Sequence, residues 1–330
     1  MKILVIISIL LFTLSCESED LNQTQTELEQ DANVILLTLD GVRYEEFFNS
    51  DIFNRYWSKH AHQSTVLGHP NKQSKVRIAN FSVLSLPAYK TIHSGKRSFC
   101  FTNNCGFPKE ETLSEKLLRV HNWHQSKVAI ISSWFNICYS AVRSLKNVLN
   151  SCGNKPLRLS DHDEININQT IDLPSWEGRK DKYTFQHAVK YIINHRPRFL
   201  HLALLDSDEW AHKNDWKNYI KSLKKYDLYI DQLFKLLENL GDYGNKTTVI
   251  ITTDHGRGKG KKWTSHGKTW HARKIWMALK GPNIPHKGPI DHKYEVNHLH
   301  IRPIIELLLG VKDIYGKKRI LKLFKDQLIQ

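Results

Sequence analysis

Four short apolar runs dominate the sequence and constrain what the chain can fold into. Each run is rich in Val, Ile, Leu or Thr, without a strict alternation of polar and apolar residues. They occupy residues 33–40, 127–134, 199–208 and 247–254. Runs of this kind are typical of strands whose two faces are both covered by other elements.

Amphipathic helical patterns lie between these predicted strands. Examples are residues 112–123, 183–195 and 218–241, the last of which ends at Gly241 as a helix stop is expected to do. Strands that alternate with helices predict an α/β fold with a mainly parallel central sheet and helices on both faces. Although 330 residues exceed the usual domain size, α/β folds of this length often share one core, so we expect a single domain.

Acidic residues stand at the ends of three of the four runs. They are Asp40, Asp206 with Asp208, and Asp254, and His212 and His255 follow two of them closely. In open parallel sheets the carboxyl ends of the strands border the ligand-binding crevice, so we expect these side chains to converge. Several buried carboxylates repel one another unless cations neutralise them. The pattern therefore predicts a metal site.

The spacing of these residues supports that prediction. Asp208 and His212 are four residues apart and share one face if their segment is helical. Asp254 and His255 are adjacent, and the following Gly256 and Gly258 permit the turn that lets both reach one ion. Mixed carboxylate and imidazole ligands suit Zn²⁺, with Mn²⁺ or Fe as alternatives. A structural role is commoner for any single one of these residues, but their joint occurrence favours metal binding.

The first 16 residues are predicted to be an export signal. The apolar run from Ile3 to Leu14 is too short to cross a bilayer comfortably. Cys16 resembles the acylated cysteine of a bacterial lipobox, although Thr13 stands where that motif prefers Leu. We expect a periplasmic or cell-surface protein, lipid-anchored to the membrane at Cys16, with plain signal cleavage as the alternative. Residues 17–31 are predicted to form a flexible tether before the catalytic domain at 32–330.

Export has a consequence for the other four cysteines. Outside the cytosol they are candidates for disulfides, and local pairs are the simplest of the three possible connectivities. These pairs are Cys100 with Cys105 and Cys138 with Cys152. Four buried free thiols are the alternative.

The chain is strongly basic, with 48 Lys and Arg against 33 Asp and Glu and a formal net charge of +15. This charge favours anionic partners such as phosphate esters, nucleic acid or lipid headgroups, but does not choose among them. We expect a small anionic phosphoester as the substrate and predict no specific nucleic-acid partner.

Six sequence blocks resemble the alkaline phosphatase superfamily, especially its nucleotide pyrophosphatase/phosphodiesterase-like branch. In chain order they are "TLDGVRYEEFF", "NFSVLSLPAYKTIHSG", "DSDEWAHKNDW", "TTDHGRG", "WTSHG" and "IWMALKGP". Together they span most of the chain from about residue 33 to 310. The resemblance implies an alkaline phosphatase-like fold and an enzyme that hydrolyses phosphoric esters with two divalent metal ions.

The same resemblance implies roles for individual residues. Asp40, Asp254 and His255 would hold one ion together with a nucleophile at Ser85, and Asp208, His212 and His266 would hold the other. His271 is the rival of His266, but only His266 lies in the "W..HG" context. Asp206 matches no ligand position and is expected to cap its strand.

Ser85 has a second possible role. Ser followed by Leu-Pro is often a helix cap, and both roles are compatible, because the helix dipole and a bound cation favour the alkoxide. Ser82 is the competing hydroxyl, one turn too early for the family block. Asn103 or Asn104 matches an asparagine that binds the phosphoryl group, although a turn between the neighbouring cysteines explains this pair equally well.

The substrate class is narrowed by differences from the family. Tyr89 stands where sulfatases need Arg, which disfavours a sulfatase, and the expected absence of several membrane spans disfavours lipopolysaccharide phosphoethanolamine transferases. A phosphodiesterase or nucleotide pyrophosphatase is our first expectation and a phosphomonoesterase the alternative. Arg43, Lys90 and the basic residues 257–262 could supply the charge that a monoesterase needs. A non-catalytic basic surface lipoprotein that binds anionic polymers is the second alternative.

Overall fold

A computed structural model describes residues 31–267 and 269–320 of the chain. The predicted signal, Cys16 and residues 17–30 of the tether lie outside the described residues. The strands are β1 (Asn33–Leu39), β2 (Thr65–Leu67), β3 (Val76–Arg77), β4 (Val128–Ser132), β5 (Leu149–Cys152), β6 (Phe199–Leu204), β7 (Thr247–Thr252), β8 (Lys274–Ile275), β9 (Met277–Lys280), β10 (Gly288–Pro289) and β11 (Val296–Asn297). The helices are α2 (Tyr44–Phe47), α3 (Ser85–Ser94), α4 (Leu113–His121), α5 (Cys138–Ala141), α6 (Asp163–Ile171), α7 (Asp181–His195), α8 (Asp206–His212), α9 (Trp216–Asn239), α10 (Asp242–Asn245) and α11 (Ile301–Leu308).

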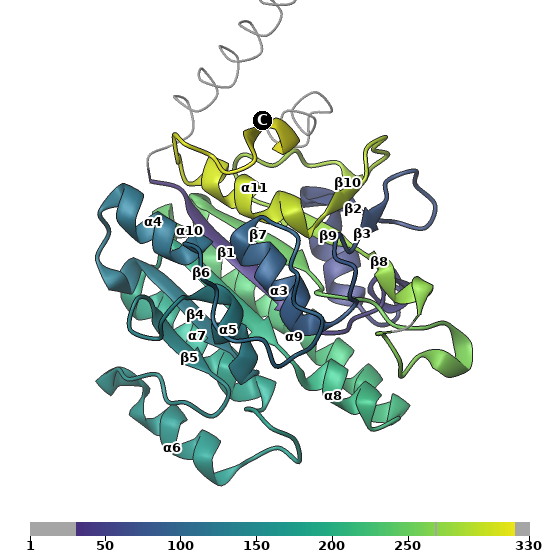
Figure 1. Cartoon of the computed structure of the whole chain (residues 1–330), viewed down its shortest axis with the longest axis horizontal. Helices are drawn as coiled ribbons and strands as arrows, with labels where there is room; N and C mark the ends of the chain where they lie inside the picture. Colours follow the sequence, from purple (N-terminus) through teal and green to yellow (C-terminus); the bar gives the residue numbers. More distant parts are fainter. Residues whose placement is uncertain (1–30, 268, 321–330) are drawn as a thin grey trace, which may run out of the picture.

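An eight-stranded sheet in the order β10-β2-β9-β7-β1-β6-β4-β5 forms the centre of the molecule (Figure 1). Its strands pair in parallel except β9, which is antiparallel to β7 and β2. The four predicted strands are β1, β4, β6 and β7, neighbours within this sheet. The α/β fold with a mainly parallel sheet is therefore confirmed.

Helices cover both faces of the sheet, and a hydrophobic core lies on each side. On one face α3, α4, α5 and α11 pack against the sheet through residues such as Tyr89, Leu117 and Ile305. On the other face α7 and α9 contribute Tyr191, Tyr226 and their neighbours. Because both faces are covered, strand residues such as those of β1 and β6 are buried throughout. This explains why the apolar runs do not alternate.

The predicted strand at 199–208 is too long at its carboxyl end. β6 stops at Leu204, and Asp206 and Asp208 lie in the first turn of α8. Asp206 therefore does not cap a strand: its Oδ1 accepts a hydrogen bond from the backbone N–H of Asp181, at the start of α7 (3.2 Å).

Both predicted disulfides are present. Cys100 is bonded to Cys105, and Cys138 to Cys152, which links α5 to the edge strand β5. Among the described residues, no helix is both long enough and apolar enough to cross a membrane.

Candidate active site

The sheet brings the predicted ligands together at the carboxyl ends of its central strands. Asp40 directly follows β1 and Asp254 follows the neighbouring β7, while α8, which carries Asp208, begins just after β6. Ligand atoms of Asp40, Asp254 and His255 lie within 4.8 Å of one another, as do those of Asp208, His255 and His266. All five side chains are buried. The expected residues therefore converge at the carboxyl ends of the central strands, as predicted.

The first group is arranged to receive a cation. His255 Nδ1 lies 3.0 Å from the carbonyl oxygen of Gly256, so this nitrogen donates and Nε2 carries the lone pair. That Nε2 is 3.7 Å from Asp40 Oδ1 and 3.4 Å from Asp254 Oδ2. Both of these carboxylate oxygens are buried without a hydrogen-bond partner. A lone pair beside two orphaned carboxylate oxygens fits a metal ion, because no donor in the group satisfies these oxygens when both carboxylates are ionised.

The second group differs from the first, because Arg257 and His212 pair with the two carboxylate oxygens of Asp208. Asp208 and His212 share one face of α8, as their spacing predicts, with 2.9 Å between Oδ2 and Nε2. His266 Nδ1 is 2.8 Å from the carbonyl oxygen of Val83, which leaves its Nε2 as an acceptor, 3.3 Å from His212 Nε2. These residues fit a second ion, held between one carboxylate and two imidazoles.

The charges around the two groups are unequal. Burial and the neighbouring carboxylates raise the pKa of Asp40 well above its usual range and that of Asp254 to about 6. Burial also disfavours ionised Asp208, but Arg257 and His212 outweigh it and hold the pKa of Asp208 well below its usual range. Burial lowers the pKa of His255 to about 4 and that of His266 to about 3. The site therefore lacks positive charge chiefly beside Asp40 and Asp254.

Ser85 is the first residue of α3, and its side chain faces this cluster. The residue in the N-cap position is Leu84, in an extended conformation, and no side chain caps the helix. The Ser85 hydroxyl is instead 3.1 Å from His255 Nε2. The helix places this hydroxyl at its amino end, where the dipole favours negative charge. Ser82 lies in the segment before the helix.

The two candidate asparagines occupy different positions. Asn103 Oδ1 accepts a hydrogen bond from the backbone N–H of Leu86 (3.1 Å), which places Asn103 against the first turn of α3. Asn104 is exposed, and its backbone N–H donates to the hydroxyl of Thr102 (3.2 Å). The structure thus brings Asn103, but not Asn104, to the helix that carries Ser85.

His271 lies apart from the cluster. Its Nε2 pairs with the carboxylate of Glu45, and its ring lies 5.6 Å from that of Tyr44.

The basic residues expected to provide charge around the substrate are mostly engaged elsewhere. Arg257 is fully buried and pairs with Asp208, while Arg43 is buried and pairs with Glu46. Lys90 donates to the carbonyl oxygens of Gly106 and Tyr139 (2.5 and 3.0 Å). Of the basic residues at 257–262, Lys259, Lys261 and Lys262 are exposed.

Two participants were not foreseen from the sequence. The Tyr89 hydroxyl is buried and donates to Asp40 Oδ2 (3.3 Å). Gly41 donates its backbone N–H to Asp254 Oδ1 (3.0 Å). The only sequence signal for either was its place within a family block, next to a predicted nucleophile or ligand.

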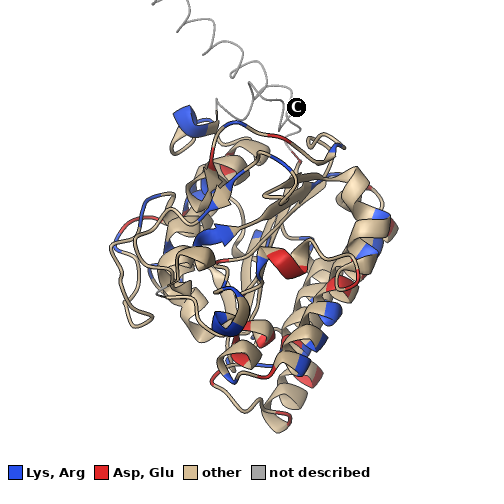
Figure 2. Ribbon diagram, turned by 90° about the vertical axis from the view of Figure 1, so that its right-hand side faces the viewer, with Lys and Arg blue, Asp and Glu red and all other residues tan. Residues whose placement is uncertain are grey.

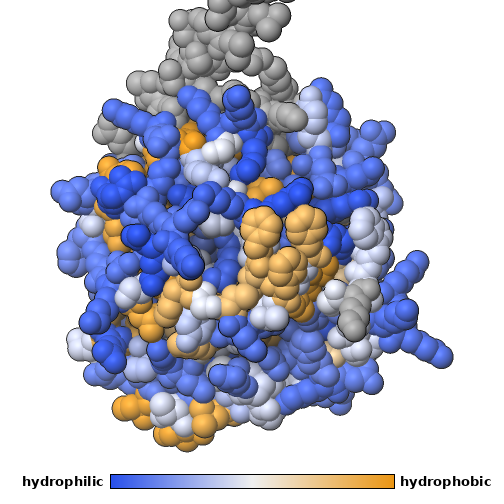
Figure 3. Space-filling view, in the orientation of Figure 1, coloured by the Kyte–Doolittle hydropathy of each residue, from blue (hydrophilic) through white to orange (hydrophobic). Residues whose placement is uncertain are grey.

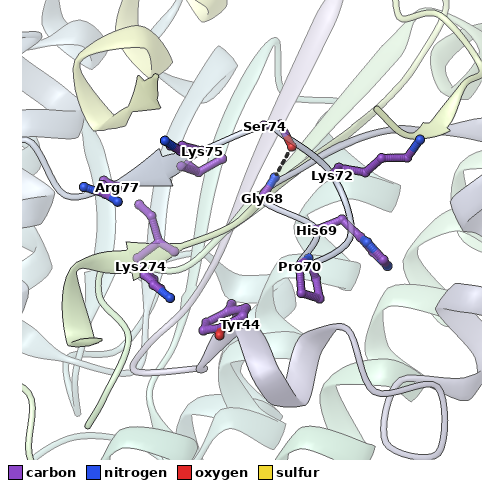
Figure 4. A pocket seen from close by; sticks show the side chains of 11 residues that line it. Tyr44, Gly68, His69, Pro70, Lys72, Ser74, Lys75, Arg77 and Lys274 are labelled. Carbon is purple, nitrogen blue, oxygen red and sulfur yellow. Dashed lines mark hydrogen bonds between the residues drawn. The ribbon is translucent and has the colours of Figure 1, made fainter. Parts of the chain in front are cut away.

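A cationic pocket was also not predicted. It has a volume of about 230 Å³, and Figure 4 shows Lys75, Arg77 and Lys274 on one side and His69 and Lys72 on the other. Tyr44, four residues after Asp40, forms part of its wall. Four of these basic residues, His69, Lys72, Lys75 and Arg77, lie in one segment, and Lys274 joins them from a segment about 200 positions away.

Comparison with known proteins agrees with this geometry. The Metalloenzyme superfamily matches residues 128–272. The fold is similar to an alkaline phosphatase superfamily protein from Vibrio parahaemolyticus, with a TM-score of 0.58, 12% identity and coverage of 86% of this chain and 67% of that one. The predicted resemblance to the alkaline phosphatase superfamily is confirmed.

Two further superfamily structures share the fold. For a phosphonate monoester hydrolase from Silicibacter pomeroyi the TM-score is 0.60 at 11% identity, covering 88% of this chain and 76% of that one. For the lipoteichoic acid synthase LtaP from Listeria monocytogenes the TM-score is 0.61 at 12% identity, and the match covers 89% of this chain and 78% of that one. At these identities the likeness concerns the fold alone.

Curated relatives match shorter segments. GPI ethanolamine phosphate transferase 1 from Homo sapiens is 29% identical over an alignment of 133 residues, and the match covers 34% of this chain and 14% of that protein. Its counterpart from Aspergillus oryzae is 31% identical over an alignment of 99 residues, and the match covers 28% of this chain and 9% of that protein. The chain thus spans a small part of the relatives it matches. Members of the superfamily are hydrolases and transferases of phosphoester or sulfate ester groups. This supports an enzymatic function for the chain, either hydrolysis or transfer to an acceptor.

Proposed function

We propose that the chain is a two-metal phosphoester hydrolase that uses Ser85 as its nucleophile, with phosphodiesterase or nucleotide pyrophosphatase-like activity. The observation that carries this proposal is the pair of buried, unpartnered oxygens, Asp40 Oδ1 and Asp254 Oδ2, around His255 Nε2. The Ser85 hydroxyl lies 3.1 Å from the same nitrogen.

In this proposal Asp40, Ser85, Asp254 and His255 hold one ion, and Asp208, His212 and His266 hold the other. The mixed oxygen and nitrogen ligands favour Zn²⁺, with Mn²⁺ or Fe as alternatives. When bound, such ions lower the pKa of a hydroxyl group or a water and neutralise charge on the phosphoryl oxygens.

The chain's own residues then have defined tasks. Ser85 would lose its hydroxyl proton to water and its Oγ would attack phosphorus, so that an Oγ–P bond forms while the P–O bond to the leaving group breaks. The leaving-group oxygen then takes up a proton from water. A water then attacks phosphorus, the Oγ–P bond breaks, and Ser85 regains a proton. Because Asn103 Oδ1 accepts from Leu86, the Asn103 amide NH₂ is the part that can donate to a phosphoryl oxygen.

Two observations support a diester rather than a monoester. Arg43 and Arg257 are engaged with carboxylates, so they do not provide the extra positive charge that a dianionic monoester needs. Figure 3 shows hydrophobic side chains gathered over the centre of the face seen in Figure 1. The exposed Phe81, Phe99 and Phe101 come from the segments before and after α3, where a second ester group could pack.

Two alternatives have their own support. The cations of the pocket in Figure 4 favour a phosphomonoesterase if that pocket contributes to substrate binding. The transferase relatives favour an acceptor hydroxyl in place of water in the second step. Figure 2 shows Lys and Arg spread over helices and loops among acidic residues, and not gathered on one face in that view, which weakens the non-catalytic polymer-binding alternative.

The test compares Zn²⁺-loaded protein on bis-p-nitrophenyl phosphate and p-nitrophenyl phosphate. We expect faster hydrolysis of the diester, loss of activity with EDTA, and a fall of at least about a thousandfold for Ser85→Ala. Ser82→Ala is the matched control and should stay near wild type. Equal activity of Ser85→Ala and wild type on both esters would contradict the proposal.

Export and lipid anchoring at Cys16 form part of the proposal. The two disulfides between near neighbours support an oxidising compartment. In a bacterial host with a lipoprotein pathway, we expect the full chain in the membrane fraction and Cys16→Ser outside it. Recovery of wild type as a soluble secreted protein would instead support plain signal cleavage.

A further inference from the structure

A third group of potential metal ligands lies away from the candidate active site. It joins the short turn Ser160–His162, before α6, to the carboxyl-terminal turn of α7. Ligand atoms of Asp161, His162 and His195 lie within 4.8 Å of one another. Asp161 Oδ2 is 3.4 Å from His195 Nε2 and 3.8 Å from His162 Nε2.

A chain of buried hydrogen bonds fixes which nitrogen of His162 carries its proton. Arg179 can only donate, and its Nη1 lies 3.0 Å from Gln169 Oε1, which identifies that atom as the carbonyl oxygen. His187 Nε2 is 3.1 Å from the same oxygen, so this nitrogen must also donate. Burial and the nearby Arg179 lower the pKa of His187, so its ring is neutral and its Nδ1 can only accept.

The consequence falls on His162. Its Nδ1 is 2.8 Å from His187 Nδ1, so His162 donates there and keeps a lone pair on Nε2. His162 is fully buried, and its Nε2 has no hydrogen-bond partner; His195 Nε2 is likewise buried without one. A simple pair between His195 and Asp161 would leave the His162 lone pair unsatisfied. A cation satisfies all three groups at once.

We propose that Asp161, His162 and His195 form a Zn²⁺ site that is separate from the catalytic centre. The separations of 3.4 and 3.8 Å are close to the ~3.3 Å between ligands of a tetrahedral ion with bonds near 2.0 Å. Asn194 Nδ2 donates to Asp161 Oδ2 (2.7 Å) and holds the carboxylate in place.

The surroundings favour this site in two ways. The His187–Gln169 chain orients His162 in the manner of the outer hydrogen bonds that accompany metal-bound histidines. His195 is the last residue of α7, and the negative end of a helix dipole attracts a cation. The ion links the turn before α6 to α7, so its role is to stabilise this region of the fold. The proposal does not depend on the proposed catalytic function.

The experiment counts zinc in the full chain. Purified protein is loaded with Zn²⁺, freed of excess metal and analysed for zinc per chain, in wild type, His195→Gln and His124→Gln. His124 is exposed and bonded to Ser126, and serves as the matched control. We expect His195→Gln to hold one zinc fewer, to hydrolyse the diester as wild type does, and to unfold at a lower temperature in Zn²⁺ but not in EDTA.

Other variants separate this site from the catalytic one. Asp254→Asn should lose zinc together with activity, whereas Asp161→Asn should repeat the result of His195→Gln and replaces it if that variant does not fold. With Co²⁺ in place of Zn²⁺, the tetrahedral absorption should fall in both Asp161→Asn and His195→Gln. The proposal would be overturned if Asp161→Asn and His195→Gln held as much zinc as wild type, or if they lost activity along with the zinc.

Discussion

The backbone of Gly41 packs closely against the proposed metal ligands. Its φ of +66° is unfavourable for other residues, and a Cβ atom there would lie 2.3 Å from Asp208 Oδ1. Gly41→Ala should therefore cost about 1–2 kcal/mol in backbone strain and also displace Asp208. We expect diesterase kcat/KM to fall more than about tenfold, because displacement of a metal ligand disturbs positioning.

Gly260→Ala is the control for this substitution. Gly260 has a similar φ of +56°, but nothing lies within 4 Å of an added Cβ. Thermal unfolding should show comparable strain in both variants, while only Gly41→Ala loses activity. Equal activities would show that the close approach to Asp208 is unimportant.

The adjacent asparagines offer a second test at the residue scale. Only Asn103 contacts the first turn of α3, whereas Asn104 is exposed. Asn103→Ala should lower kcat by roughly tenfold to a hundredfold, in keeping with loss of a donor to the phosphoryl group, and Asn104→Ala should leave it unchanged. The measurement is steady-state hydrolysis of the diester, and the reverse order would assign the role to Asn104.

The place of a single residue in the site could be predicted from the sequence only where its near neighbours in the chain indicated it. Asp40 and Asp254 stand where strands end, and the four-residue spacing of Asp208 and His212 gave their common helix face. Arg257 was interpreted, together with the lysines that follow it, as a source of positive charge for the substrate. Its partner Asp208 is 49 positions away, and no local spacing reports such a contact.

At the scale of elements, the type of each long segment was predictable and its ends were not. β6 stops at Leu204 because the chain there turns into α8, whose first turn includes acidic residues that favour a helix start. The region 135–180 had no recognisable motif. It contains β5, which pairs with β4 by backbone hydrogen bonds that carry little sequence signal.

The Cys138–Cys152 bond should be the main contribution to the stability of that region. It closes a loop of 14 residues between α5 and β5, for which chain entropy predicts about 3 kcal/mol. We expect the double variant Cys138→Ser/Cys152→Ser to lose about that free energy of unfolding in urea while keeping diesterase activity.

The Cys100–Cys105 bond provides the comparison. It closes a shorter loop of 5 residues, which contains Asn103. Its removal should therefore lower the free energy of unfolding less, and diesterase activity more, than removal of the Cys138–Cys152 bond. If both double variants lose the same stability and the same activity, neither the loop-length argument nor the role of Asn103 holds.

At the scale of the whole molecule, two buried histidines connect the sheet to the helix that carries Ser85. His201 on β6 is 3.0 Å from Thr38 Oγ1 and, through its other nitrogen, 3.0 Å from His93 on α3. Burial lowers the pKa of His201 to about 3 and that of His93 well below its usual range. Neither charge nor hydropathy pattern predicted this pair, because each residue looks polar in its own segment.

These shifts make the free energy of unfolding depend on pH. Below an unfolded-state pKa of about 6.5, the unfolded chain binds protons that the folded chain does not. The contribution of these two histidines to the free energy of unfolding should therefore be constant above that pH and fall as the pH drops towards 3, by at most about 1.4 kcal/mol per pH unit for each histidine. We expect this slope in urea unfolding between pH 7 and 4.5, measured with EDTA present so that metal release does not contribute.

His201→Asn should reduce the slope by about one proton, even if it lowers stability at pH 7, whereas His124→Gln, at an exposed position, should leave it unchanged. An identical slope in His201→Asn and wild type would mean that His201 is not neutral in the folded chain.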